Sequence, residues 1–186
     1  MNILPYDIHS RLVEECKAGN RNAQRELYGM YAKAMYNVCY RMMNNADDAS
    51  DMLQEAFIDA FTRLHTFRNE STFGFWLKKI VINKCINVKQ RRKIEWISAE
   101  NIELDDKADD EDTIDEEELK LNVERVKLAM QMLPEGGRLI FSLYLLEGYD
   151  HSEIAQILNI TESTSKTQFM RARNRVKEIL LMMPLA

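Results

Sequence analysis

An acidic segment divides this chain in two, and it limits the fold more than any other feature of the sequence. Residues 95–118 hold 13 Asp and Glu against Lys107 alone, a net charge of −12. Their few apolar residues follow no sustained period, so the segment buries too little surface to fold by itself. We therefore predict an acidic, flexible linker at 95–118 between two domains, residues 1–94 and 119–186.

The two flanking parts are basic. Residues 1–94 carry a net charge of +5 and residues 119–186 a net charge of +2, so the overall charge of −5 conceals two modules suited to a polyanion. Only six Gly and three Pro interrupt the 186 residues, and apolar residues recur at three- and four-residue intervals. We predict an all-α fold made of two small helical domains.

Cysteine usage and the chain's beginning indicate a compartment. Cys16, Cys39 and Cys85 are isolated from one another among apolar helix positions, which favours buried, reduced thiols over a disulfide frame or a zinc site. The first ten residues are too short and too polar for a signal peptide, and no apolar run is long enough for membrane insertion. We expect a soluble, cytoplasmic protein.

The first domain should contain four helices. Residues 9–19 predict a short helix that Gly19 ends, and Asn20 or Asn22 is positioned to cap a longer one over 23–43. The third helix begins at Asp47, where acidic side chains suit the positive end of the helix dipole. The fourth lies between residues 69 and 93.

That fourth helix interleaves an apolar stripe with a polar one. Helical spacing places one set of apolar residues inward, with Trp76 among the predicted core: Phe73, Trp76, Leu77, Ile80, Val81 and Val88. A second set recurs every four residues and forms a polar stripe: Lys79, Asn83, Asn87 and Arg91. Further cations surround this stripe: Lys78, Lys84, Lys89, Arg92 and Lys93. Asn side chains read base edges and cations bind phosphates, so a nucleic-acid-binding helix and a solvated amphipathic helix explain this segment equally well.

The third helix presents an acidic outer face made of Asp47, Asp48, Asp51, Gln54 and Glu55. Three readings fit it: a solvated helix face, a docking surface for a basic partner, and a metal site in a nuclease built on Asp48, Asp51 and Glu55. No His accompanies these carboxylates, so we predict no metal. We also predict no cofactor and no enzymatic activity, because no nucleophile, acid–base pair or phosphate loop is present.

The second domain has the pattern of a helix-turn-helix. We predict a helix ending before Pro134, a turn over 134–137, and an apolar helix over 138–146. Asp150 is placed to cap the next helix, Asn159 to occupy a left-handed turn, and Thr161 to cap the last helix. One side of this last helix presents polar and basic residues to a major groove: Lys166, Thr167, Met170 and Arg171, flanked by Arg173 and Arg175.

Two ordered sets of motifs resemble a known family. DDASDMLQEAF is followed by FRNESTFGFWL and then by a helix that ends in a basic run, and the second domain contains LPE, EGYDHSEIA and RARNRVK. Together they resemble bacterial RNA polymerase sigma factors, most closely the extracytoplasmic-function class. Three departures stand out, Gly136–Gly137, Asn159 and Ser165, and Ser165 with Gln168 obscures the base preference of the last helix.

The resemblance implies a role for each surface. The acidic helix, with Asp47, Asp48, Asp51, Gln54 and Glu55, would dock on the clamp helices of the polymerase's largest subunit. The promoter's minus-ten element would be melted and one base captured by the loop and fourth helix: Phe67, Asn69, Ser71, Thr72, Lys79, Asn83, Asn87, Arg91 and Arg92. The minus-thirty-five element would be read by Lys166, Thr167, Met170, Arg171 and Arg173.

The sequence therefore predicts a sigma factor that binds core RNA polymerase and promoter DNA, with an anti-sigma factor as a further partner. The alternative is a freestanding helix-turn-helix regulator, either repressor or activator, that binds duplex DNA without polymerase. The first domain separates the two, since such a regulator has no use for the acidic helix and the aromatic, Asn-bearing helix.

Overall fold

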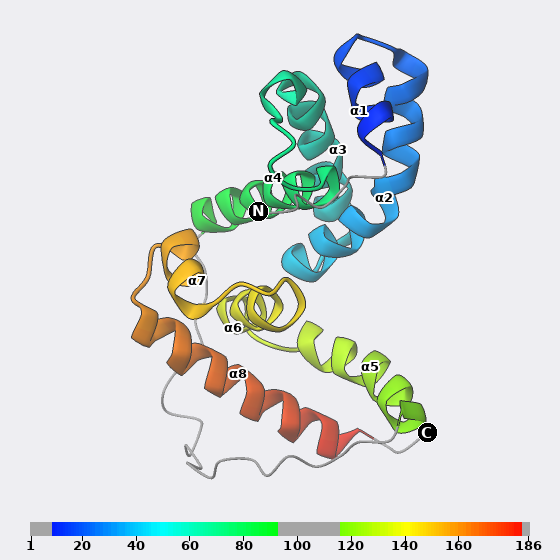
Figure 1. Cartoon of the computed structure of the whole chain (residues 1–186). Coiled ribbons are helices and arrows are strands. Elements are labelled where there is room, and N and C mark those ends of the chain that lie inside the picture. Colours follow the sequence, from blue (N-terminus) through cyan, green and yellow to red (C-terminus); the bar gives the residue numbers. More distant parts are fainter. Residues whose placement is uncertain (1–8, 93–115, 184–186) are drawn as a thin grey trace, which may run out of the picture. The chain divides into compact units, whose positions relative to one another are not determined.

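The computed structural model describes residues 9–92 and 116–183, with side chains in the first helix of the second part described from Val123 onward. Every regular element within these residues is helical, and the chain divides into two compact units (Figure 1). The predicted all-α fold with two helical domains is confirmed. The predicted linker at 95–118 lies outside the described residues except at its end, where a helix already begins at Glu116.

The first unit contains α1 (Ser10–Lys17), α2 (Arg21–Met43), α3 (Ala46–Thr62), the 3₁₀ turn η1 (Leu64–Thr66) and α4 (Phe73–Arg91). Local signals set the helix ends. The Asn20 side chain accepts hydrogen bonds from the backbone N–H groups of Asn22 and Ala23, which identifies Asn20 as the cap of α2. Asn45 caps α3 in the same way.

Helices α2, α3 and α4 pack on one another and form the core of the first unit (Figure 1). The buried residues of α4 are Phe73, Leu77, Val81, Ile82, Cys85, Ile86 and Lys89. Ile82, Cys85 and Ile86 were not in the predicted stripe, and Ile80 and Val88 are only half-buried. The reason is that α4 contacts both α2 and α3, so its buried face is wider than a stripe facing one neighbour. The three cysteines are buried and unbridged.

The second unit contains α5 (Glu116–Gln131), α6 (Glu135–Phe141), the π-helical turn η3 (Ser142–Leu146), α7 (His151–Leu158) and α8 (Glu162–Met182). Its local predictions hold. Asp150 and Glu153 form a reciprocal capping box at the start of α7, and Thr161 caps α8. Asn159 has a left-handed backbone with φ +55°, which turns the chain from α7 into α8. These elements form the predicted helix-turn-helix.

The prediction of a turn over residues 134–137 is wrong, because α6 begins at Glu135. Pro134 stands just before this helix, and both Gly136 and Gly137 are buried within it. The buried Arg138 side chain donates from Nη1 to the carbonyl oxygen of Leu133 at 2.8 Å, which ties the end of α5 to α6. Packing against α8 outweighs the low helix propensity of two glycines.

Helix α5 lies beside α8 and shares an apolar core with it (Figure 1). Arg125 of α5 donates to the carbonyl oxygens of Leu180 and Met183, both at 3.0 Å, and so satisfies acceptors at the end of α8. No helix in the described ranges combines the length and the apolar content needed to cross a membrane.

Candidate nucleic-acid interface

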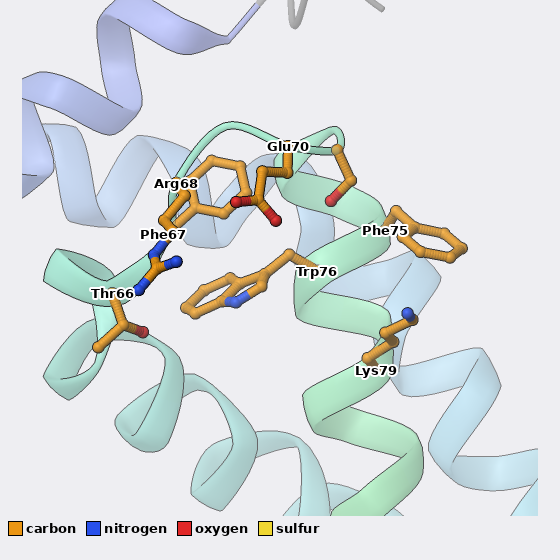
Figure 2. Close-up of a pocket in the computed structure, with 8 residues that line it drawn as sticks. Thr66, Phe67, Arg68, Glu70, Phe75, Trp76 and Lys79 are labelled. Atoms are coloured by element: carbon orange, nitrogen blue, oxygen red, sulfur yellow. The ribbon is translucent and has the colours of Figure 1, made fainter. Parts of the chain in front are cut away.

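The segment between η1 and α4, with the first turns of α4, forms a pocket of about 480 Å³ (Figure 2). It is lined by Thr66, Phe67, Arg68, Glu70, Ser71, Phe75, Trp76 and Lys79. Its volume lies in the range of small-molecule sites. A pocket of this volume has room for an extruded nucleobase.

Aromatic rings form one wall of the pocket. Phe67 is buried, and its ring centroid lies 5.2 Å from that of Trp76 and 6.0 Å from that of Phe73. Lys17 of α1 fixes this wall, because its ammonium donates to the Phe67 carbonyl oxygen at 3.0 Å and lies 5.6 Å from the Phe67 ring centroid. The pocket is therefore held by tertiary contacts.

The assignment of Trp76 to the core is wrong. Trp76 is half-buried, and its indole reaches into the pocket toward Thr66 and Arg68 (Figure 2). Helical spacing places Trp76 beside the core, but the loop before α4 passes far enough away to leave a cavity over the ring. This indole is available for stacking with a ligand.

The four predicted loop residues occupy different places. Phe67 and Ser71 line the pocket, whereas Asn69 and Thr72 do not. Asn69 has φ +58°, and its side chain hydrogen-bonds Glu14, whose pKa is lowered mainly by the Lys17 ammonium and to a smaller degree by Asn69. Thr72 is the cap of α4, accepting from the Phe75 N–H at 3.3 Å.

The polar stripe of α4 has the predicted geometry. Lys79, Asn83, Asn87 and Arg91 are all exposed, on the side away from the buried face. Lys89 departs from the prediction, because it is only 5% exposed and its ammonium donates to the Met43 carbonyl oxygen at 3.3 Å. The Lys89 ammonium therefore connects α4 to the end of α2 and does not contribute to the basic surface.

The acidic face of α3 is linked to α4 by ion pairs. Asp47, Asp51, Gln54 and Glu55 are exposed as predicted. Asp48 accepts two hydrogen bonds from the Arg92 guanidinium, at 2.6 and 3.0 Å, which lower the pKa of the Asp48 carboxyl. Asp48 and Arg92 were predicted on different surfaces, because no local sequence pattern links residues that are 44 positions apart in the chain.

Lys84 makes a second connection between α4 and α3. Its ammonium lies 3.0 Å from a carboxylate oxygen of Asp59 and 3.2 Å from one of Glu55, and these partners raise the pKa of Lys84. Glu55 and Asp48 are thus each paired with a cation. Within the described residues, no three His, Cys, Asp or Glu side chains gather as metal ligands.

In the second unit, the predicted reading face belongs to α8. Lys166, Met170 and Arg173 are exposed, whereas Thr167 and Arg171 are half-buried. Lys166 pairs with Glu162 one turn earlier, at 2.6 Å. The five residues lie between positions 166 and 173 of α8, on the side away from its buried residues.

Ser165 and Gln168 face the interior of the second unit and do not belong to the reading face. The Ser165 hydroxyl is fully buried and lies 2.9 Å from Nδ1 of His151 in α7. The His151 ring stacks on Tyr144 with centroids 4.5 Å apart. Burial, together with the charge of Lys166, lowers the pKa of His151. A polar pair thus connects α7 to α8 at Ser165, one of the three departures from the family pattern.

Comparison with known proteins agrees with this arrangement. Sigma-70 region 2 matches residues 27–95, and Sigma-70 region 4 matches residues 124–176. The ECF RNA polymerase sigma-E factor of Escherichia coli strain K12 is 32% identical over 176 residues, which span 89% of this chain and 90% of the relative. The chain belongs to the ECF sigma factors. The resemblance inferred from the motifs is confirmed.

Other members of the family are similar over the same length. The ECF RNA polymerase sigma factor SigW of Bacillus subtilis is 27% identical over 179 residues, covering 90% of this chain and 94% of that protein. The sigma factor RpoE of Bartonella quintana, solved with the anti-sigma factor NepR, has a TM-score of 0.53 at 20% identity and covers 86% of this chain. This structural likeness supports the fold.

Proposed function

We propose how this sigma factor divides promoter-specific initiation between its two units. The first unit, within residues 1–94, docks on core RNA polymerase through α3 and holds the opened minus-ten strand on α4. The second unit, within residues 119–186, reads the minus-thirty-five element with α8. The acidic segment 95–118 links them.

The observation that carries this proposal is the continuity between the pocket and the polar stripe. Lys79 lines the pocket and also begins the exposed series that continues through Asn83, Asn87 and Arg91. A strand lying along α4 would place its phosphates near the cations, its base edges near the Asn amides, and one extruded base against Trp76. Stacking on an aromatic face offsets part of the cost of unstacking that base from the duplex.

The second unit supports duplex recognition. Arg and Lys bind guanine edges or phosphates in a major groove, and Met170 and Thr167 offer apolar contact to thymine methyl groups. All four residue types lie on the predicted reading face of α8, whose start is fixed by the Thr161 cap. We assign Lys166, Thr167, Met170, Arg171 and Arg173 to the minus-thirty-five element.

The acidic face of α3 supports docking on a basic polymerase surface. Asp47, Asp51 and Gln54 are exposed, while Asp48 and Glu55 also pair with cations of α4. Docking on α3 and strand binding on α4 therefore take place on helices that are tied together. Phosphodiester synthesis belongs to the polymerase, so we assign no catalytic group to this chain. Because its proposed partner is core RNA polymerase, we place its action in the cytoplasm.

An anti-sigma factor is part of the proposal. The Bartonella quintana relative was solved with such a partner, and its fold is shared by this chain. A partner that covers the stripe of α4 or the reading face of α8 would prevent promoter binding.

Transcription in vitro tests the function. Purified protein is added to sigma-free core polymerase on genomic fragments, and start sites are read from the products. Specific initiation supports the proposal and identifies the promoter sequence. Tight binding to duplex DNA without initiation would instead favour a freestanding helix-turn-helix regulator.

A further inference from the structure

Phe75 extends the polar stripe by one helical turn. It precedes Lys79 by four residues, the same interval that separates Lys79 from Asn83, so one face of α4 begins with an aromatic ring. The Phe75 side chain is 44% exposed, although burial of a phenyl group is strongly favourable. Packing of the core therefore does not account for this ring.

Two cations hold the Phe75 ring. The Lys79 ammonium lies 4.8 Å from the ring centroid and the Lys78 ammonium lies 5.9 Å from it. Both Phe75 and Trp76 line the pocket, but they point in different directions: the Trp76 indole is directed toward Thr66 and Arg68, and the Phe75 ring points the other way, beside Lys79 (Figure 2). An exposed aromatic ring with a cation beside it is the combination that proteins use to bind single strands.

We propose that Phe75 is a stacking platform for a second base of the opened strand, the neighbour of the base held in the pocket. The inference rests on the proposed function. Lys79 lines the pocket and contacts the Phe75 ring, so its ammonium is placed to neutralise the phosphate that joins the two bases. Every base has a π-face, so the platform favours strand opening and adds little sequence preference.

The test uses variants that separate stacking from apolar burial. Phe75→Leu keeps an apolar side chain without a ring, Phe75→Ala removes both, and Phe75→Tyr keeps the ring. Met30→Ala is the matched control, because Met30 is an exposed apolar side chain of α2 outside the proposed interface. Holoenzyme is assembled from core polymerase and each full-length variant on a promoter identified by the transcription assay.

The measurement places 2-aminopurine at each minus-ten position of the non-template strand in turn. An analogue that leaves the duplex without a new stacking partner becomes bright, whereas one that stacks on a ring stays dim. We expect two adjacent dim positions with the wild-type chain, and one of them to become bright with Phe75→Leu. The rate of opening should fall roughly tenfold for Phe75→Leu and Phe75→Ala, and Phe75→Tyr should restore it.

Three results would overturn the inference. The first is that Phe75→Leu opens the promoter at the wild-type rate with both positions dim. The second is that the rate of opening falls in Phe75→Ala but not in Phe75→Leu, which would show that the apolar area of the side chain matters and that stacking does not. Failure of wild-type holoenzyme to initiate on any fragment would refute the proposed function itself, and the platform with it, whereas normal wild-type initiation with unchanged variants refutes the platform alone.

Discussion

Replacing Asp48 by Asn removes the carboxylate that holds Arg92 at the end of α4. The pair makes two hydrogen bonds, at 2.6 and 3.0 Å, but the side chains of Asp48 and Arg92 are 27% and 54% exposed. Exposed pairs contribute about 0.2–1 kcal/mol because water screens them, and bidentate geometry favours the upper part of that range. We expect the free energy of unfolding to fall by about 0.5–1 kcal/mol in Asp48→Asn.

The pH dependence follows from the lowered pKa of Asp48. The folded state holds this carboxylate ionised to lower pH than the unfolded state does, because Arg92 favours the charged form. The stabilisation is therefore fully present above the usual carboxyl pKa and is lost as the pH falls through the folded-state value. Wild type and Asp48→Asn should differ in stability at neutral pH and converge in acid.

Urea unfolding provides the assay. The chain has two tryptophans, so Trp96→Phe leaves Trp76 as the single indole reporting on the first unit. In that background, Asp48→Asn, Arg92→Gln and the double variant form a double-mutant cycle. The coupling free energy should weaken in about 1 M salt, where the Debye length is about 3 Å. The Arg11–Glu15 pair of α1, at 93% and 40% exposure, is the matched control and should show a smaller coupling.

Transcription by the same variants separates stability from docking. If Asp48 contacts the polymerase as proposed, Asp48→Asn should reduce initiation far more than its small loss of stability explains. A coupling free energy above about 2 kcal/mol would refute the reasoning from exposure. Unchanged initiation by Asp48→Asn would refute the assignment of Asp48 to docking.

Three further predictions concern other residues. Asn159→Ala should destabilise the second unit by about 1 kcal/mol because its backbone is left-handed, while Asn159→Gly should be close to neutral; equal thermal midpoints for the two would contradict this. Because the pKa of His151 is lowered, the second unit is most stable above the usual value of 6.5 and loses stability as the pH falls from there. Circular dichroism melts should show that His151→Gln removes this pH dependence of stability. Ser165→Ala should lower the free energy of unfolding by about 1 kcal/mol. Lys166→Ala should weaken binding to the upstream element and reduce the salt dependence of that binding by the equivalent of about one phosphate contact. Asn83→Ala should leave binding unchanged and slow the opening of the promoter after binding. Equal losses of duplex affinity in the two variants would contradict this assignment of roles.

Signals that act over a few residues were readable from the sequence. The Asp150 cap, the Thr161 cap and the left-handed Asn159 each depend on a side chain and the backbone within four positions of it, so they were predicted without knowledge of the packing. The exposed series from Lys79 to Arg91 was predicted for the same reason, since a period of 3.6 residues fixes which side chains share a helix face.

The site itself required the tertiary structure. Trp76 and Lys89 have helical positions that spacing alone cannot assign, because exposure depends on which neighbouring helix or loop covers each side chain. The Asp48–Arg92 pair joins residues that lie far apart in the chain. The sequence alone thus determined the all-α fold, most of the helix ends and the polar stripe of α4, whereas the start of α6 at Glu135 depended on packing against α8. Only the packing of α2, α3 and α4 decided which faces meet, because contacts between distant residues arise from the positions of whole helices.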